Sequence, residues 1–344
     1  MGYPVRAVED GEVFQIKHFA GADGKVLYIR HKNSRITVYA HLFEFMPEIE
    51  TLVRKERRQG KKYGFRIWLE KPIRIKKGSI IGYSGKSGTL SPHLHFEIRS
   101  SDNQPINPFK NGFPVADISP PILKGIVLEP ADPSSAVEGG FAGRRFDFVQ
   151  RDGEYILAKN PWVAGRVRIT LEACDQTTAG SCNGVYRIEA YSKSSRCSFI
   201  VSFEKFSFRD NFKGLSIYQK ESNFFKGRYL YRLFSIPSAC TPFLDTKPYP
   251  SWPGWLEAGE YLTIKVYDAS DNYAIGKILL KEDPGYYNFS DRVVKYPFLI
   301  KEGEKKAVSI DNGSFKLEFN PDSLCSRDYL SIQKKRKRGG QFIR

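Results

Sequence analysis

The sequence predicts a mostly β protein with two or three domains. Short runs rich in Val, Ile, Phe, Tyr and Thr recur along the 344 residues, and 29 glycines and 20 prolines interrupt them. The composition, with 41% hydrophobic and 14% aromatic residues, is typical of a globular chain. Two or three domains fit the length, because one domain usually takes about 100 to 200 residues.

The first 113 residues contain a series of short segments rich in strand-forming residues, and within residues 36–42 and 93–99 apolar and polar side chains alternate. A period of two is typical of strands with one face in a core. We therefore expect strands at residues 11–18, 25–31, 36–42, 65–69, 80–84 and 93–99. The charged stretch of residues 46–62 is expected to be a surface excursion that holds a short helix and adds nothing to the core.

The segment SPHLHFEIR, residues 91–99, places His93 and His95 on the same face of a predicted strand. The opposite face, with Leu94 among its residues, is expected to meet a core, and Pro92 suits the first residue of the strand. Residues two apart on a strand are separated by roughly 6 to 7 Å. At this spacing one imidazole can bind a metal while its neighbour moves a proton. The alternative is that both are solvated polar residues.

A third histidine lies on another predicted polar strand face. In the segment RITVYAHLF, residues 35–43, we expect Thr37, Tyr39 and His41 on the side that points away from the core. His31 comes at a strand end before a turn, and we interpret it as structural.

Residues 78–88 read GSIIGYSGKSG and do not form a nucleotide-binding phosphate loop. Such a loop needs glycine at position 80, which is Ile80, and a helix afterwards, where this sequence predicts a strand. We expect tight turns at the four glycines of this segment, since a positive φ costs glycine little. These are Gly78, Gly82, Gly85 and Gly88.

A change in character around residues 105–121, which are rich in proline, marks the first expected domain boundary. From about residue 121 to residue 282, alternating segments separated by polar turns favour an immunoglobulin-like β-sandwich. The remaining residues are expected to form a small β unit that ends in a basic tail. This unit need not be complete in the chain. The predicted domains are residues 1–113, 114–283 and 284–344.

The net charge of +16 favours an anionic partner: nucleic acid, a lipid surface or an acidic wall polymer. The basic run of residues 334–338 is interpreted as a solvated tail, and we expect no nucleic-acid partner. Binding of nucleic acid through this tail stays an alternative, which predicts an affinity that falls steeply with salt. No apolar run reaches 18 residues, so we expect no transmembrane segment, and the N-terminus shows no secretory signal pattern.

Five cysteines occur at positions 174, 182, 197, 240 and 325, without a C-x-x-C pair. Cys174 and Cys182 flank a polar segment that a disulfide could close in an oxidising compartment. Buried free thiols are the alternative, because cysteine is often a small core residue. The odd number leaves at least one thiol unpaired.

Four segments resemble, in order, the motifs of the lysostaphin-type or LytM-type zinc metallopeptidase family: PVRAVEDGEV, VLYIRHKNSRITVYAHL, IRIKKGSIIGYSGKSGTLSPHLHFEIR and INPF. The resemblance covers about residues 3–112. It implies a LytM-type antiparallel β-sheet domain that uses Zn²⁺ to hydrolyse peptide cross-links of bacterial peptidoglycan. The peptide stems would be its substrate and the cell envelope its location, and the C-terminal domains could contact another envelope protein.

The resemblance also implies roles for three residues of this chain. His95 matches a zinc ligand of the family, and His41 and His93 match the pair of histidines beside the reacting water and the scissile carbonyl. The family takes two further ligands from an H-x-x-x-D motif ahead of the strand PVRAV, and this chain begins three residues before that strand. His18 and Asp23 are one residue too far apart to replace that motif.

Two explanations account for the missing ligands. The chain is either a fragment of a zinc metalloendopeptidase or a metal-free relative that binds the wall or activates another hydrolase. Because a metal-free relative has no chemical reason to retain all of His41, His93 and His95, the sequence favours the fragment. On this interpretation the present chain binds zinc weakly.

Overall fold

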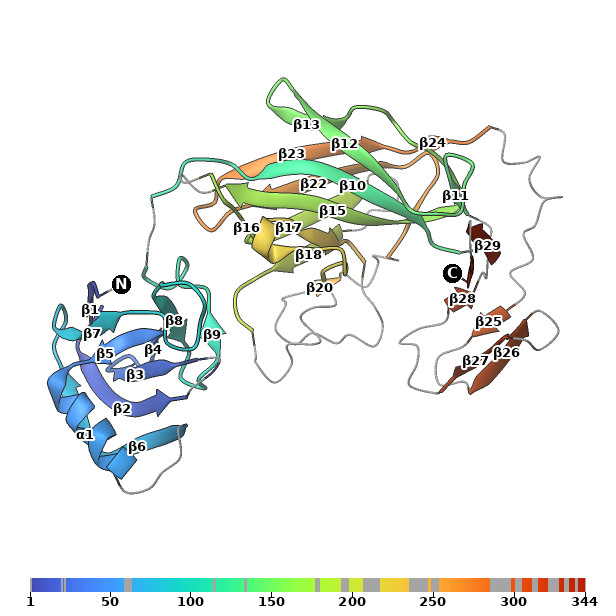
Figure 1. Ribbon diagram of the computed structural model, residues 1–344. Coiled ribbons are helices and arrows are strands. Elements are labelled where there is room, and N and C mark those ends of the chain that lie inside the picture. The colour runs from blue at the N-terminus through green and yellow to red at the C-terminus, as the bar shows by residue number, and fades with distance from the viewer. Residues whose placement is uncertain are drawn as a thin grey trace. The chain divides into compact units, whose positions relative to one another are not determined.

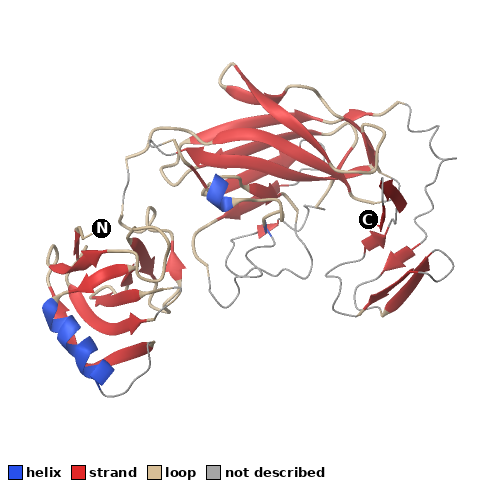
Figure 2. Cartoon of the chain, in the orientation of Figure 1, coloured by secondary structure: helices blue, strands red, loops and turns tan. Residues whose placement is uncertain are grey.

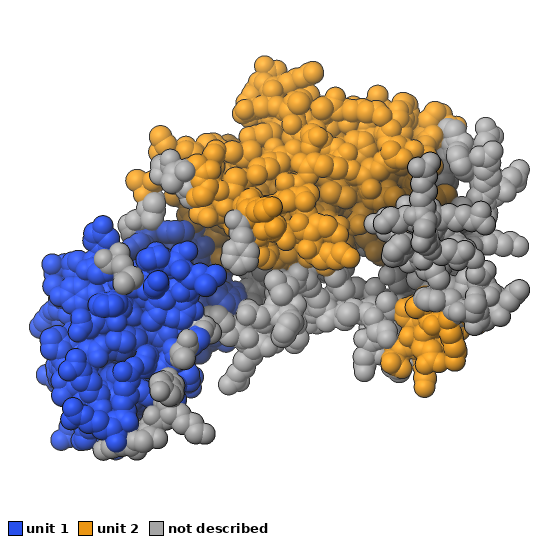
Figure 3. Space-filling view, in the orientation of Figure 1, with its two compact units in different colours: residues 1–114, 204–208 blue, residues 115–203, 209–344 orange. Residues whose placement is uncertain are grey.

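The structure is a computed structural model, and strands predominate in it, which confirms the predicted mostly β class (Figure 2). It describes residues 2–19, 21, 23–58, 64–113, 116–132, 135–176, 180–192, 198–206, 217–234, 247–248, 254–284, 298–300, 305–310, 315–320, 328–330, 334–337 and 340–343. The chain divides into two compact units (Figure 3). Unit 1 comprises residues 1–114 and 204–208, and unit 2 comprises residues 115–203 and 209–344. The three predicted domains remain predictions.

Unit 1 consists of two antiparallel sheets and one helix (Figure 1). The larger sheet has the order β6-β2-β3-β4-β8-β9, and the smaller sheet has the order β1-β7-β5. The elements are β1 Pro4–Arg6, β2 Gly11–His18, β3 Lys25–His31, β4 Ile36–Ala40, β5 Leu42–Phe45, α1 Pro47–Arg58, β6 Phe65–Ile75, β7 Ile80–Ser84, β8 His95–Arg99 and β9 Pro105–Ile106.

Strand β4 lies in the middle of the larger sheet and is buried on both faces. One apolar cluster, which includes Val38 and Ala40, packs on one face. A second cluster, which includes Tyr39, packs on the other face with side chains of the smaller sheet and the helix. Thr37 and Tyr39 are only 3% and 1% exposed, so the predicted polar face of this strand is wrong. A sheet covered on both sides buries even its threonine and tyrosine side chains.

Helix α1 contributes to the core, which corrects the expectation of a purely superficial segment. Ile49 and Val53, one helical turn apart, are fully buried in the cluster between the two sheets. Glu50 on the same helix accepts a hydrogen bond from Lys25 Nζ at 2.6 Å and another from the backbone N–H of Phe45 at 3.2 Å. The charged residues of this segment therefore surround a narrow apolar stripe.

The four glycines of residues 78–88 divide into two kinds. Gly78 and Gly88 have positive φ angles of 82° and 74°, as expected for turns. Gly82 and Gly85 instead permit close backbone approach, because a Cβ atom there would lie 2.6 Å from the Glu44 carbonyl oxygen and 2.4 Å from the Phe43 nitrogen. The turn prediction is therefore wrong for these two.

Unit 2 contains one continuous path of hydrogen-bonded strands, β16-β15-β10-β12-β13-β23-β22-β17-β18-β20, with β19 and β21 also paired to β15. Side chains from both halves of this path meet in a single large apolar cluster. The strands are β10 Ile122–Pro130, β12 Arg144–Arg151, β13 Glu154–Leu157, β15 Arg166–Gln176, β16 Cys182–Asn183, β17 Arg187–Ser192, β18 Ser198–Ser202, β19 Leu230–Arg232, β20 Lys247–Pro248, β21 Leu256–Glu257, β22 Tyr261–Tyr267 and β23 Tyr273–Leu279. The immunoglobulin-like topology stays a prediction.

Shorter elements complete unit 2. A small sheet has the order β11-β14-β24, and three further strand pairs follow towards the C-terminus. The bounds are β11 Ala136–Val137, β14 Trp162–Ala164, η3 Phe224–Lys226, β24 Lys281–Glu282, β25 Phe298–Ile300, β26 Lys306–Ile310, β27 Phe315–Phe319, β28 Asp328–Leu330, β29 Lys334–Lys337 and β30 Gly340–Ile343. The basic run thus forms a strand paired with β30 over residues 334–337.

Cys174 of β15 and Cys182 of β16 form a disulfide, one of the two alternatives that the sequence left open. The other three cysteines, at positions 197, 240 and 325, lie outside the described residues. The helices in the described part of the chain are all too short or too polar to cross a lipid bilayer.

Three carboxyl groups of unit 2, from Asp117, Asp175 and Asp268, place oxygen atoms within 4.8 Å of one another. Asp268 is 1% exposed, and its carboxylate accepts hydrogen bonds from the backbone N–H groups of Ser270 and Asn272. Asp175 Oδ1 is buried and has no hydrogen-bond partner among the described residues. Burial, followed by the negative charges of Asp268 and Asp117, raises the pKa of Asp175 to about 6.

The raised pKa predicts that Asp175 destabilises unit 2 at neutral pH. The pKa of Asp175 is about 6 in the folded chain, against 3.8 for an unperturbed carboxyl group. The contribution of Asp175 to the free energy of unfolding is therefore most favourable below pH 4 and is lost as the pH rises through 6. We expect Asp175→Asn to raise the free energy of unfolding at pH 7 by on the order of 1 kcal/mol, allowing for solvent screening of a half-buried group.

Urea denaturation at pH 4 and pH 7 measures this effect. The stabilisation by Asp175→Asn should shrink at pH 4, where the native carboxyl is protonated. Asp152→Asn is the matched control, because Asp152 lies exposed in the turn between β12 and β13. An equal gain at both pH values would show that the carboxylate charge is not the cause.

Candidate functional site

His41 occupies the junction between β4 and β5 and leaves the strand in a left-handed backbone conformation, with φ of 59°. Residues other than glycine seldom adopt this conformation, and it is found most often where surrounding contacts hold the residue. Here the His41 ring donates from Nδ1–H to the Ser87 carbonyl oxygen at 2.9 Å. A carbonyl oxygen can only accept, so the neutral ring keeps its lone pair on Nε2.

The loop that carries Ser87 is itself attached to the start of β3. The backbone N–H of Lys25 donates to Ser87 Oγ at 2.8 Å. A Cβ atom on Gly24 would lie 2.0 Å from the Ser87 carbonyl oxygen, and Gly24 has a φ of 63°, so the close approach requires glycine. The position of His41 therefore depends on two other segments of unit 1, the loop that carries Ser87 and the start of β3.

His93 and His95 belong to different local structures, although they are two residues apart. Strand β8 begins at His95, which pairs with Ala40 of β4, and so starts two residues after the expected first residue, His93. His93 precedes the strand, where its backbone N–H donates to the Gly85 carbonyl and its ring donates from Nδ1–H to the Ser91 carbonyl at 2.9 Å. Leu94 is 40% exposed, so its expected place against a core is wrong.

The structure brings the three histidines together. The ring centroid of His41 lies 4.7 Å from that of His93 and 5.7 Å from that of His95. Because Ala40 is paired with His95, the next residue, His41, emerges beside it. His93 and His95 are exposed and His41 is partly buried, so the cluster is accessible from solvent.

The electrostatics of the cluster are set mainly by Glu97. His95 donates from Nε2–H to Glu97 Oε1 at 2.7 Å, and this hydrogen bond, more than the opposing effect of burial, raises the pKa of His95. Burial raises the pKa of Glu97, but its hydrogen bonds with His95 and Arg99 outweigh this effect and lower it. Glu97 is not among the site residues expected from sequence, although its position two residues after His95 in SPHLHFEIR places both side chains on one face of the strand.

His31 and His18 lie outside the cluster. His31 is 4% exposed, and its two ring nitrogens contact the Asp10 carbonyl oxygen at 2.9 Å and Thr37 Oγ1 at 2.8 Å. These contacts agree with a structural role. His18 contacts Arg57 at the end of α1, and burial, followed by the charge of Arg57, lowers the pKa of His18.

The histidine cluster offers nitrogen atoms of the kind that bind a metal. Imidazole nitrogens suit Zn²⁺, and Nδ1 of His95 has no hydrogen-bond partner in the described part of the chain. Within the same residues, however, the group that places three ligand atoms within 4.8 Å of one another is the aspartate group of unit 2 and not the histidine cluster. The histidines therefore do not complete a three-ligand site by themselves.

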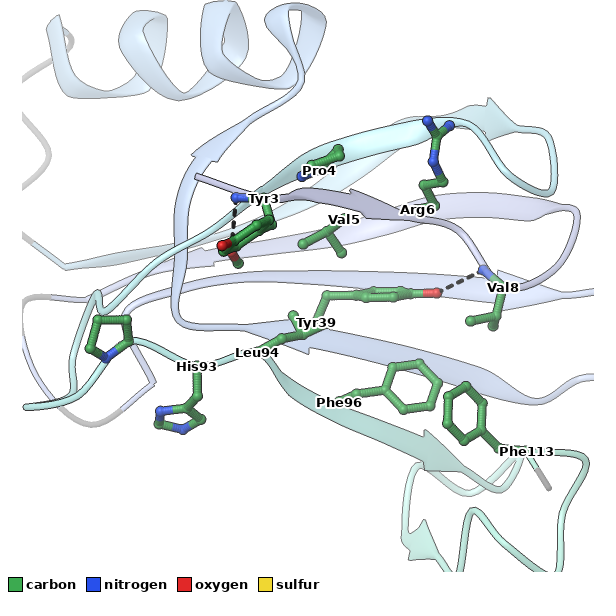
Figure 4. Close-up of a pocket in the computed structure, with 12 residues that line it drawn as sticks. Tyr3, Pro4, Val5, Arg6, Val8, Tyr39, His93, Leu94, Phe96 and Phe113 are labelled. Carbon is green, nitrogen blue, oxygen red and sulfur yellow. Dashed lines mark hydrogen bonds between the residues drawn. The ribbon is translucent and has the colours of Figure 1, made fainter. Parts of the chain in front are cut away.

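A groove of about 580 Å³ adjoins the histidine cluster. Its lining is largely apolar and aromatic, with His93 near one end and the neighbouring rings of Phe96 and Phe113 near the other (Figure 4). Tyr39 forms part of the wall and accepts a hydrogen bond from the backbone N–H of Val8 at 3.1 Å. The volume of the groove is within the range of about 300 to 1,000 Å³ that is usual for ligand pockets, and His93 is the member of the histidine cluster that lines it.

Sequence comparison bears on the first part of the chain. The sequence profile of peptidase family M23 matches residues 1–61. This confirms the resemblance to LytM-type peptidases.

Curated proteins similar to this chain include two that are called DD-carboxypeptidase/endopeptidase Mpg. Those of Neisseria meningitidis serogroup B and Neisseria gonorrhoeae are each 33% identical to the chain over 119 residues. The match covers 34% of this chain and 22% of each relative, so the chain spans only about a fifth of their length.

Solved structures similar to this chain include two peptidases. The catalytic domain of the M23 protein EnpA from Enterococcus faecalis is 22% identical, with a TM-score of 0.24 over 32% of this chain and 71% of that domain. A zinc-containing peptidase from Vibrio cholerae is 27% identical, with a TM-score of 0.23 over 34% of this chain and 28% of that protein.

The contacts of the histidines predict different effects on stability. We expect His31→Ala to lower the free energy of opening of β3 and β4 by about 2 to 4 kcal/mol, because it leaves buried polar partners unpaired. His93→Ala, at an exposed position, should change it by less than about 0.5 kcal/mol. Hydrogen exchange of the β3 and β4 amides measures both. Equal effects of the two substitutions would contradict this distinction.

Proposed function

We propose that unit 1 is the peptidase domain of a zinc-dependent endopeptidase that hydrolyses peptide cross-links of bacterial peptidoglycan. The observation that carries this proposal is the convergence of His41, His93 and His95 at one accessible point of an M23-type domain. The names of the Neisseria relatives, DD-carboxypeptidase/endopeptidase, support a peptidase activity. In this proposal His95 is a zinc ligand, and His41 and His93 are catalytic.

The hydrogen bonds of the cluster support this division of roles. His41 and His93 each donate from Nδ1–H to a backbone carbonyl, so each neutral ring presents a basic Nε2 atom. Such a nitrogen can accept a proton from the attacking water, and the resulting N–H can stabilise a developing oxyanion. Zn²⁺, when bound, would supply Lewis acidity towards the peptide carbonyl.

Other features support a peptide substrate in the cell envelope. The apolar groove beside His93 can hold a peptide stem, and the net charge of +16 favours an anionic wall or membrane surface. The disulfide between Cys174 and Cys182 fits an oxidising compartment. We also propose that residues 114–283 form an immunoglobulin-like domain and that this domain and the small β unit of residues 284–344 contact an envelope partner.

A non-catalytic module that binds the wall or activates another hydrolase is the second candidate. One observation favours it: among the described residues, the histidine cluster does not bring three possible ligand atoms within 4.8 Å of one another. Both candidates predict binding to peptidoglycan peptides. They differ in whether the cluster gains tight zinc binding and hydrolysis once two further ligands are provided.

Zinc titration of two proteins separates the candidates. We expect the present chain to bind Zn²⁺ weakly, because one assigned ligand does not make a site. A version with an H-x-x-x-D segment added ahead of the PVRAV strand should bind Zn²⁺ stoichiometrically and release peptide fragments from purified peptidoglycan. His95→Ala in that version should lower hydrolysis by roughly 100-fold or more.

His18→Ala is the matched control for loss of an imidazole outside the cluster, and it should leave hydrolysis within about two-fold. Mass spectrometry of the released muropeptides identifies the bond that is cut. Should the version with added ligands fold and bind zinc without releasing fragments, the enzyme proposal is wrong. If the present chain nevertheless sediments together with purified peptidoglycan, this result would support the non-catalytic binding module.

A further inference from the structure

Strand β8 carries a row of three polar side chains that are connected to one another. His95, Glu97 and Arg99 alternate along the strand and so share a face. Glu97 uses a different oxygen for each neighbour: Oε1 accepts from His95 Nε2–H at 2.7 Å, and Oε2 accepts from Arg99 Nε–H at 2.6 Å. Its carboxylate is thus held from both sides.

The row is anchored inside unit 1 by its last member. The Arg99 side chain is 9% exposed, and its guanidinium lies over the Tyr28 ring, 5.3 Å from the centroid. Arg99 also donates to Asn103 Oδ1 at 3.2 Å, across the turn after β8. The Glu97 side chain is 13% exposed, whereas that of His95 is 45% exposed. Along the row, the Arg99 guanidinium is buried, the Glu97 carboxylate is nearly buried, and the His95 imidazole is accessible to solvent.

The carboxylate determines which nitrogen of His95 carries a proton. An ionised carboxylate can only accept hydrogen bonds, so the nitrogen that faces it, Nε2, must be the donor. The neutral His95 ring then has its lone pair on Nδ1. His41 and His93 have the opposite arrangement, because carbonyl oxygens hold their Nδ1–H groups. The cluster therefore combines one free Nδ1 with two free Nε2 atoms.

We propose that Glu97, held by Arg99, is a positioning residue that fixes His95 in the Nε2–H tautomer and leaves Nδ1 as its metal-binding atom. A carboxylate that accepts a hydrogen bond from the second ring nitrogen of a metal-binding histidine fixes the orientation of the ring and increases its basicity. The role of Nδ1 as a ligand atom rests on the proposed function. The tautomer of His95 does not, because it follows from contacts in the metal-free chain.

Nuclear magnetic resonance of the whole chain, labelled with ¹⁵N in its histidines, tests this inference without metal. Long-range ¹H–¹⁵N spectra are recorded above the titration of His95, where the ring is neutral. We expect Nε2–H for His95, with an observable ring N–H proton signal, and Nδ1–H for His41 and His93. In Glu97→Ala the His95 N–H signal should be lost and the two ring nitrogens should shift towards the values of a solvent-exposed imidazole.

Three further variants sharpen the test. Glu97→Gln keeps an oxygen acceptor and should retain the His95 tautomer. Arg99→Lys keeps the charge without the planar fork and should weaken the signal. Glu70→Ala, at an exposed position of β6, is the matched control and should change nothing.

Two results would overturn the inference: an Nδ1–H tautomer of His95 in the native chain, or identical His95 spectra in the native chain and in a folded Glu97→Ala variant. A fixed His95 tautomer combined with absent zinc binding after addition of the two ligands would instead refute the proposed function and leave the role of Glu97 in place.

Discussion

The antiparallel register between β4 and β8 sets Ala40 opposite His95, and the candidate site depends on this pairing. Side chains of a strand alternate, so a shift of one residue would turn His95 to the other face of the sheet and away from His41. Such a shift is costly here, because both faces of β4 are buried and every one of its side chains would exchange its surroundings. The apolar core of unit 1 thereby fixes the geometry of polar residues at its edge.

The site combines a rigid part with a part built from loops. His95 is the first residue of a strand and is held through Glu97 and Arg99 to the interior. His41 and His93 lie at strand ends and depend on backbone carbonyls for their orientation. The carbonyls face Nδ1 of His41 and His93, whereas the Glu97 carboxylate faces Nε2 of His95, so the acceptors select opposite tautomers. Neighbouring imidazoles can therefore perform different chemistry although their residue type is the same.

Much of unit 1 could be predicted from the sequence. The expected strands at residues 11–18, 25–31 and 80–84 agree with β2, β3 and β7, because short runs rich in β-branched and aromatic residues are typical of strands. The sequence placed His93 and His95 on one face of one strand, whereas β8 begins only at His95. The family motif brought His41 to the same site, where the structure places it.

The remaining features arise from tertiary contacts that alternation does not contain. Thr37 and Tyr39 alternate with apolar residues like a solvated face, yet a second layer covers them. The left-handed conformation of His41 depends on Ser87, which is 46 residues away in sequence. Helix α1 buries Ile49 and Val53 within a stretch whose composition is dominated by charge. Each of these depends on which segments meet, and a local pattern does not determine that.

The most direct test of this account is a nuclear Overhauser spectrum of the metal-free chain. The ring protons of His41 should show cross-peaks to the ring protons of both His93 and His95, because the ring centroids lie 4.7 Å and 5.7 Å apart. His31, buried elsewhere, should show none to these rings. Absence of cross-peaks from His41 to the other two histidines in a folded chain would contradict the claim that the three imidazoles form one site.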